Sequence, residues 1–154
     1  MKIISGGQTG IDQLALKIAK EMGFETGGYC ANGFMTETGP EEELLKSYGL
    51  IEAGSYSERT RRNVKESDIT LMFGDMWTPG SKCTIKACTD FDKPLYTNIY
   101  IGLQLAEWVG NHNIINIAGN RQSKARPETL IYFEQHFREA LRYVKQESIK
   151  TTLF

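Results

Sequence analysis

The sequence predicts an α/β protein, a Rossmann-like three-layer sandwich with a mainly parallel central sheet. Short runs typical of strands alternate with longer helical patterns along most of the chain, as in consecutive βαβ units. A glycine-rich loop, GGQTG, stands between the first such run and the first helical pattern. The length of 154 residues suits one domain with one core, and no linker or repeat divides it, so we expect a single domain over residues 1–154.

Residues 11–22 carry the clearest helical signal, because apolar side chains recur there every three or four positions and Gly23 stands where a helix would end. Ser55 and Glu58 have the spacing of a capping box, which predicts a mostly polar helix ending near Glu66. In residues 30–54 the pattern weakens, and we expect a long loop with at most a short helix. The other expected elements are strands over residues 2–5, 24–29, 69–73, 94–97 and 114–118 and helices over residues 81–91, 102–109 and 126–147.

Charge and composition exclude several classes of function. With 18 basic and 19 acidic residues the net charge is −1, so no chain-wide basic field attracts nucleic acid or anionic lipid. No apolar run approaches a membrane span, and the N-terminus lacks a signal-peptide pattern. The three cysteines form no C-x-x-C pair and there are two histidines, which predicts neither a disulfide framework nor a metal centre. We expect a soluble cytoplasmic protein without nucleic-acid or membrane partners.

The GGQTG loop comprises Gly6, Gly7, Gln8, Thr9 and Gly10. Glycines permit a tight turn there, and the free N–H groups and positive dipole end of the following helix attract an anion such as a phosphate. The motif matches neither the Walker A loop nor the dinucleotide fingerprint. It therefore indicates either a phosphate-binding loop or a tight turn with a structural role only.

Asp12, in the first turn of the same helix, also has two interpretations. A carboxylate at this position complements the helix dipole and stabilises the helix by roughly 0.3 to 1 kcal/mol. Beside a bound phosphate it would be repulsive, so a ligand role requires another partner. That partner would be a sugar hydroxyl, a heterocycle N–H or a bridging Mg²⁺.

Two further loops, residues 74–84 and 118–124, also follow predicted strands. All strands of a parallel sheet end at one edge, so these loops should converge on the crevice beside the GGQTG loop. The polar helix adds cationic side chains suited to phosphate, although a salt-bridged surface explains them equally well. Trp77 and Tyr29 could stack on a flat heterocycle, and Cys83 could face a ligand, but packing and an idle thiol are the simpler interpretations. The candidate binding residues on these segments are Arg59, Gly80, Ser81, Thr84, Asn120, Arg121 and Lys124.

Four strings identify a family resemblance: GGQTGID at residues 6–12, TGGYC at 26–30, ERTRRNVKESD at 58–68 and NIAGNRQSK at 116–124. Together they resemble the molybdenum cofactor carrier proteins, a branch of the SLOG superfamily of Rossmann-like nucleotide and nucleotide-derivative binders. The resemblance implies a homo-oligomer, a dimer or tetramer, that binds molybdenum cofactor (molybdopterin) and protects it for delivery. It also implies that a pocket is lined by Gly6, Gly7, Gln8, Thr9, Gly10, Arg59, Asn63, Gly80, Ser81 and Thr84.

A related branch, the cytokinin-activating phosphoribohydrolases, carries the motif PGGxGTxxE, in which the glutamate is needed for cleavage. The corresponding stretch here is PGSKCTIKA, residues 79–87, with Ser81 and Cys83 at glycine positions and Ala87 in place of the glutamate. This departure argues against cleavage of a nucleotide N-glycosidic bond by that mechanism.

Three functions remain open from the sequence. The first is a carrier for a small phosphorylated heterocycle, because no nucleophile, base and orienting residue can be identified as a set. The second is a nucleotide-processing hydrolase or a nucleotide-derivative sensor, with Asp12 or Glu37 as general base beside Mg²⁺ or water in the hydrolase. The third is an interaction module whose pocket binds nothing.

Overall fold

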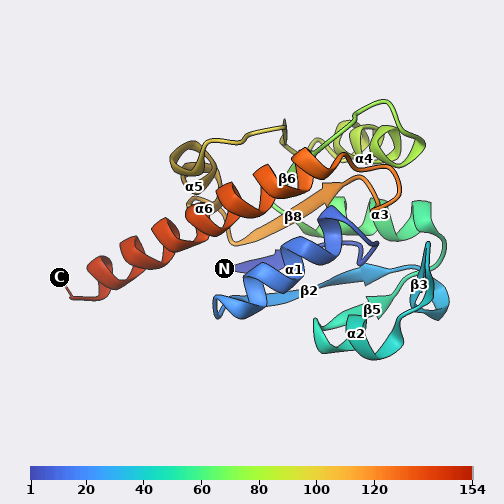
Figure 1. Ribbon diagram of the computed structural model, residues 1–154, viewed down its shortest axis with the longest axis horizontal. Coiled ribbons are helices and arrows are strands. Elements are labelled where there is room, and N and C mark those ends of the chain that lie inside the picture. The colour runs from blue at the N-terminus through green and yellow to red at the C-terminus, as the bar shows by residue number, and fades with distance from the viewer. Residues whose placement is uncertain (154) are drawn as a thin grey trace.

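Six parallel strands form the central layer of the computed structural model, which describes residues 1–153 (Figure 1). The strand order is β5-β2-β1-β8-β6-β7. The chain runs outward from β1 through β2 to β5, crosses to β6 and β7 on the other side of the sheet, and ends with β8, which pairs with β1. Every neighbouring pair is parallel, which confirms the predicted fold class. The strands are β1 (Lys2–Ile4), β2 (Glu25–Cys30), β5 (Leu50–Glu52), β6 (Ile69–Phe73), β7 (Leu95–Thr97) and β8 (Ile114–Gly119).

Helices cover both faces of this sheet. The helices α1 (Ile11–Glu21), α5 (Gly102–Gly110) and α6 (Pro127–Leu153) pack on one face, where α1 and α6 pass in front of the strands in Figure 1. Aromatic rings of Phe73, Phe133 and Phe137 fill the core between α6 and the sheet. On the opposite face lie α3 (Tyr56–Glu66) and α4 (Pro79–Asp90), which pack against each other.

The segment between β2 and α3 contains more regular structure than the sequence predicts. It holds a 3₁₀ turn (Asn32–Phe34), a hairpin of β3 (Met35–Thr36) and β4 (Gly39–Pro40), the helix α2 (Glu42–Ser47), and the edge strand β5. The expectation of a long loop with at most a short helix is therefore wrong. The strand β5 shows no strand-like pattern, because only Leu50 is buried while Ile51 and Glu52 face solvent.

Two helix boundaries also differ from the predicted ones. The helix α4 begins at Pro79, two residues early, because proline suits the first helical position and the Thr78 hydroxyl accepts the Ser81 N–H. The last helix continues to Leu153 instead of ending near residue 147. Within residues 1–153, no helix combines the length and the apolar character needed to cross a membrane.

Candidate functional site

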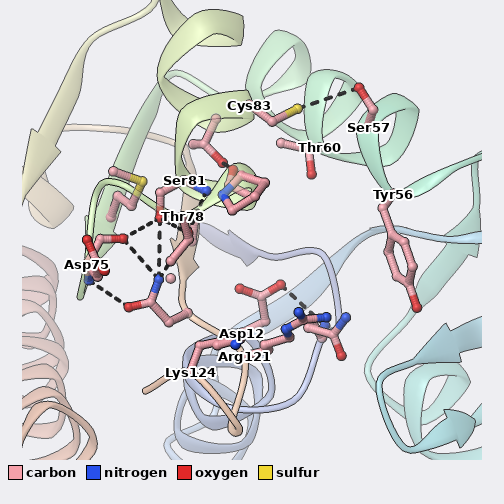
Figure 2. A pocket seen from close by; sticks show the side chains of 18 of the residues that line it. Asp12, Tyr56, Ser57, Thr60, Asp75, Thr78, Ser81, Cys83, Arg121 and Lys124 are labelled. Carbon is pink, nitrogen blue, oxygen red and sulfur yellow. Dashed lines mark hydrogen bonds between the residues drawn. The ribbon is translucent and has the colours of Figure 1, made fainter. Parts of the chain in front are cut away.

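A cavity of about 650 Å³ opens where β1, β8 and β6 end, beside the point at which the strand order reverses. Its walls are the three predicted loops and the first turn of α3 (Figure 2). This volume lies in the range of small-molecule sites, and parallel sheets bind ligands at this position. The predicted site residues that line the cavity are Gln8, Asp12, Arg59, Gly80, Ser81, Thr84, Asn120, Arg121 and Lys124.

Gly6 and Asn63 line a small recess that adjoins the cavity through Asp12 and Arg59. The Asn63 side chain forms two hydrogen bonds with the backbone of Tyr29. Asn63 Oδ1 accepts the Tyr29 N–H at 2.9 Å, and Asn63 Nδ2 donates to the Tyr29 carbonyl at 2.9 Å. A buried amide paired in this way fixes α3 to β2. The structure thus assigns the Asn63 side chain a positioning role.

Gly7, Thr9 and Gly10 do not line the cavity. A β-carbon on Gly7 would lie 2.6 Å from the Leu50 side chain, so this glycine allows close packing on β5. Gly10 has a φ of 83° and lies against the backbone of residues 120–122. Three residues of the motif therefore join the β1–α1 loop to its neighbours.

Two N–H groups of the loop are engaged by oxygen atoms of the chain. The Gln8 N–H donates to Asp12 Oδ2 at 3.3 Å, and the Thr9 N–H donates to Gln8 Oε1 at 3.1 Å. Gln8 Oε1 also accepts the N–H of Glu37 at 2.9 Å. Side-chain oxygens therefore engage the Gln8 and Thr9 amides in this structure, and phosphate binding at the GGQTG loop stays a prediction.

Asp12 and Arg59 form a buried ion pair on the cavity wall. Arg59 Nη1 lies 3.7 Å from Asp12 Oδ2, and the two side chains are 14% and 4% exposed. A β-carbon on Gly6 would overlap the guanidinium, so this glycine lets the Arg59 side chain lie directly against the loop. Burial raises the pKa of Asp12, and Arg59 and the Gln8 N–H offset this rise only in part. A perturbed carboxyl beside a cavity is a feature of functional sites.

Asn120 joins two of the loops that form the cavity. Its Oδ1 accepts the Asp75 N–H at 2.6 Å and its Nδ2 donates to the Asp75 carbonyl at 3.0 Å. The Ser81 hydroxyl donates to the same carbonyl at 2.7 Å. Both polar side chains are buried, and they hold the β6–α4 loop against the β8–α6 loop.

Glu37 does not line the cavity and lies at the tip of the β3–β4 hairpin. Its carboxylate accepts hydrogen bonds from the Thr9 hydroxyl at 2.6 Å and the Ser123 N–H at 3.0 Å. These bonds, with the Ser123 hydroxyl and the nearby Arg121, lower the pKa of Glu37 to about 2. A carboxylate so stabilised is a weak base and lies away from the cavity, so these contacts do not support Glu37 as a general base.

We expect Glu37→Gln to lower the free energy of unfolding at pH 7 by about 1 to 3 kcal/mol, because several bonds to a charged acceptor weaken. The lowered pKa stabilises the folded state above pH 4.5, and this contribution disappears as the pH falls toward about 2. Across this pH range, the midpoint temperature of thermal unfolding should fall less steeply with decreasing pH for the variant than for the wild type. Glu43→Gln, at an exposed position, is the control, and equal acid sensitivity of wild type and Glu37→Gln would contradict the role.

The aromatic residue on the cavity wall is Tyr56, at the start of α3, together with Ser57 and Thr60 (Figure 2). Sequence reasoning missed these residues, although the polar character of this helix was a signal for them. Neither Trp77 nor Tyr29 lines the cavity. The Trp77 side chain is 77% exposed, and the Tyr29 ring lies under the guanidinium of Arg62 at 4.1 Å.

Cys83 lines the cavity, with its Sγ 3.6 Å from the Ser57 hydroxyl oxygen (Figure 2). Cys30 and Cys88 are buried elsewhere, and burial raises the pKa of both thiols. Within residues 1–153, no group of three or more His, Cys, Asp and Glu side chains is arranged to hold a metal ion. The described chain thus offers neither Mg²⁺ nor molybdenum a ligand set of that kind.

Comparison with known proteins places the chain in a family. The model of the circularly permutated YpsA SLOG family matches residues 3–140. A crystal structure described as a "putative molybdenum carrier protein" from Syntrophus aciditrophicus SB is 32% identical, covers 92% of each chain and has a TM-score of 0.74. The structure of (E)-4-hydroxy-3-methyl-but-2-enyl diphosphate reductase is 14% identical over 85% of this chain and 47% of that chain, and its TM-score of 0.37 is too low to support an argument. The search of curated proteins found no significant match. The chain belongs to the circularly permutated YpsA SLOG family.

Proposed function

We propose that the protein is a carrier that binds molybdenum cofactor, or a closely similar phosphorylated heterocycle, in the cavity. The observation that carries this proposal is a ligand-sized cavity at the strand-order reversal, with the cationic side chains Arg59, Arg121 and Lys124 on its wall. The name of the similar Syntrophus protein supports the same class of cargo.

The cavity suits such a cargo chemically. Arg121 and Lys124 can neutralise a phosphate, and the N-terminus of α4 at Gly80 directs a positive dipole end toward the cavity. The Tyr56 ring offers a flat apolar surface for a heterocycle. The dithiolene of the pterin brings its own ligands to molybdenum, so the cargo requires no protein metal cluster.

Ligand-dependent thermal unfolding tests this proposal. Purified protein is heated with molybdopterin, with GMP or AMP, and with sulfate at equal ionic strength. A ligand present at 100 times its dissociation constant should stabilise the fold by about 2.7 kcal/mol, a rise of several degrees in the unfolding midpoint. If none of the heterocyclic ligands raises the midpoint above that in sulfate, the carrier function is wrong and the interaction-module hypothesis gains support.

A nucleotide-processing hydrolase is the alternative function, and it has one supporting observation. Asp12 lies on the cavity wall, and burial raises its pKa, as is common for general acids and bases. Chromatography of AMP and GMP after incubation would show product if this alternative holds, and Asp12→Asn would abolish product formation. The carrier function predicts that both nucleotides are recovered intact.

We also propose that the protein is a homo-oligomer that buries an apolar surface on α5 and the start of α6. Ile101 and Leu103 are each 61% exposed, and Ile131 and Tyr132 are 63% and 53% exposed. The ring of Tyr132 lies 6.4 Å from that of Tyr100, which brings the two segments together. Exposed apolar clusters favour association. Light scattering should give the mass of a dimer or tetramer for the wild type and a lower mass for Leu103→Lys; a monomeric wild type would contradict the proposal.

A further inference from the structure

Asp12 and Arg59 present hydrogen-bond acceptors and donors side by side on the cavity wall. Figure 2 shows the Asp12 side chain pointing into the cavity, across from the loop that carries Thr78 and Ser81. A carboxylate only accepts hydrogen bonds, and a guanidinium only donates them. The pair therefore forms a fixed pattern of acceptors next to donors that a ligand can match.

The described chain leaves bonding capacity of the Arg59 side chain unused. Arg59 Nε is buried without a hydrogen-bond partner in residues 1–153, and the guanidinium approaches Asp12 only to 3.7 Å. Asp12 accepts a long hydrogen bond from the Gln8 N–H, at 3.3 Å, and the Ser5 hydroxyl and the Gly6 N–H also lower its pKa by hydrogen bonding. Because buried polar groups in proteins are normally paired, the unused capacity indicates that a bound molecule completes it.

We propose that Asp12 and Arg59 recognise the edge of a 2-amino-pyrimidin-4-one ring, which pterins and guanine share. Along this edge the ring presents two adjacent hydrogen-bond donors, an exocyclic amino group and a ring N–H, followed by one acceptor, a carbonyl oxygen. The Asp12 carboxylate accepts the two N–H groups, and the Arg59 guanidinium donates to the carbonyl. This inference rests on the proposed function, since it names the part of the cargo that the cavity selects.

Other purine rings do not match this pattern. Adenine places an unprotonated ring nitrogen where the N–H is needed, so a lone pair faces the carboxylate. Hypoxanthine lacks the 2-amino group and leaves part of the carboxylate unpaired. Sites that hydrogen-bond a substrate group reject analogues without it. With Asp12 and Arg59 occupied by the ring, Arg121 and Lys124 are left for the phosphate.

Calorimetric titration of the full chain with GMP, IMP and AMP tests the inference, because the three share one ribose phosphate. We expect GMP to bind about 10- to 100-fold more tightly than IMP or AMP. Neopterin and its 2-oxo analogue, in which a carbonyl replaces the amino group, form a second pair without the nucleotide sugar. The amino compound should again bind more tightly. These wild-type comparisons need no variant and therefore do not depend on the folding of one.

Asp12→Asn should abolish the preference for GMP over IMP, because the amide loses one acceptor. Asp92→Asn, at an exposed position, should keep the wild-type preference. If molybdopterin binds but neither pair is discriminated, the inference is overturned and the proposed function stands. If molybdopterin, the nucleotides and neopterin all fail to bind, both are overturned.

Discussion

Arg59→Ala should lower the affinity for a heterocyclic cavity ligand by about 30- to 1,000-fold, corresponding to about 2 to 4 kcal/mol. The loss is large because the side chain is only 14% exposed and lines the cavity. Removal of the guanidinium also takes away the cation that offsets the burial of Asp12, so the pKa of Asp12 should rise further. Calorimetry with molybdopterin or GMP measures the effect on affinity.

Arg61→Ala is the matched control on the same helix. Arg61 pairs with Asp90 at 2.9 Å and lies over the ring of Phe91, so its loss should leave ligand affinity unchanged. Arg59→Lys keeps the charge but removes the planar set of donors and should recover only part of the affinity. Equal affinities of wild type and Arg59→Ala would show that the ligand binds elsewhere.

The sequence was sufficient for most of the fold because its strongest patterns are local. The stripe of α1 and the capping box of α3 are set by neighbours a few residues apart, and the buried strand β6 is apolar except for Thr70. The edge strand β5 escaped prediction because an edge with one buried residue, Leu50, lacks both an apolar run and alternation. Its position is set by pairing with β2.

The candidate site was predicted in outline because parallel strands direct their following loops to one edge. The direction of individual side chains could not be predicted. Asp12 accepts the Gln8 N–H of its own loop, and Glu37 contacts Ser123, 86 residues away in sequence. A turn motif in the sequence thus predicts a tight loop, while the structure shows which side chains contact that loop.

Gly10→Ala should destabilise the fold by at least about 3 kcal/mol and lower the unfolding midpoint by roughly 6 to 12 °C. Gly10 combines a φ of 83° with a ψ of −130°, a conformation that suits glycine. A β-carbon there would overlap the Asn120 carbonyl and lie 2.7 Å from the Gln122 nitrogen. Both are backbone atoms, so the collision can be relieved only by separating the two loops.

Gly33→Ala is the control that separates the two costs of Gly10→Ala, the steric collision and the backbone strain. Gly33 also has a positive φ, 76°, but a β-carbon there meets nothing within 4 Å, so this variant should cost only about 1 to 2 kcal/mol. Calorimetric unfolding of the two variants beside the wild type measures both terms. Because the loops that meet at Gly10 also carry Gln8 and Arg121, Gly10→Ala should weaken ligand binding as well, whereas Gly33→Ala should not. Equal destabilisation by the two variants would mean that the loops are not in close contact at this glycine.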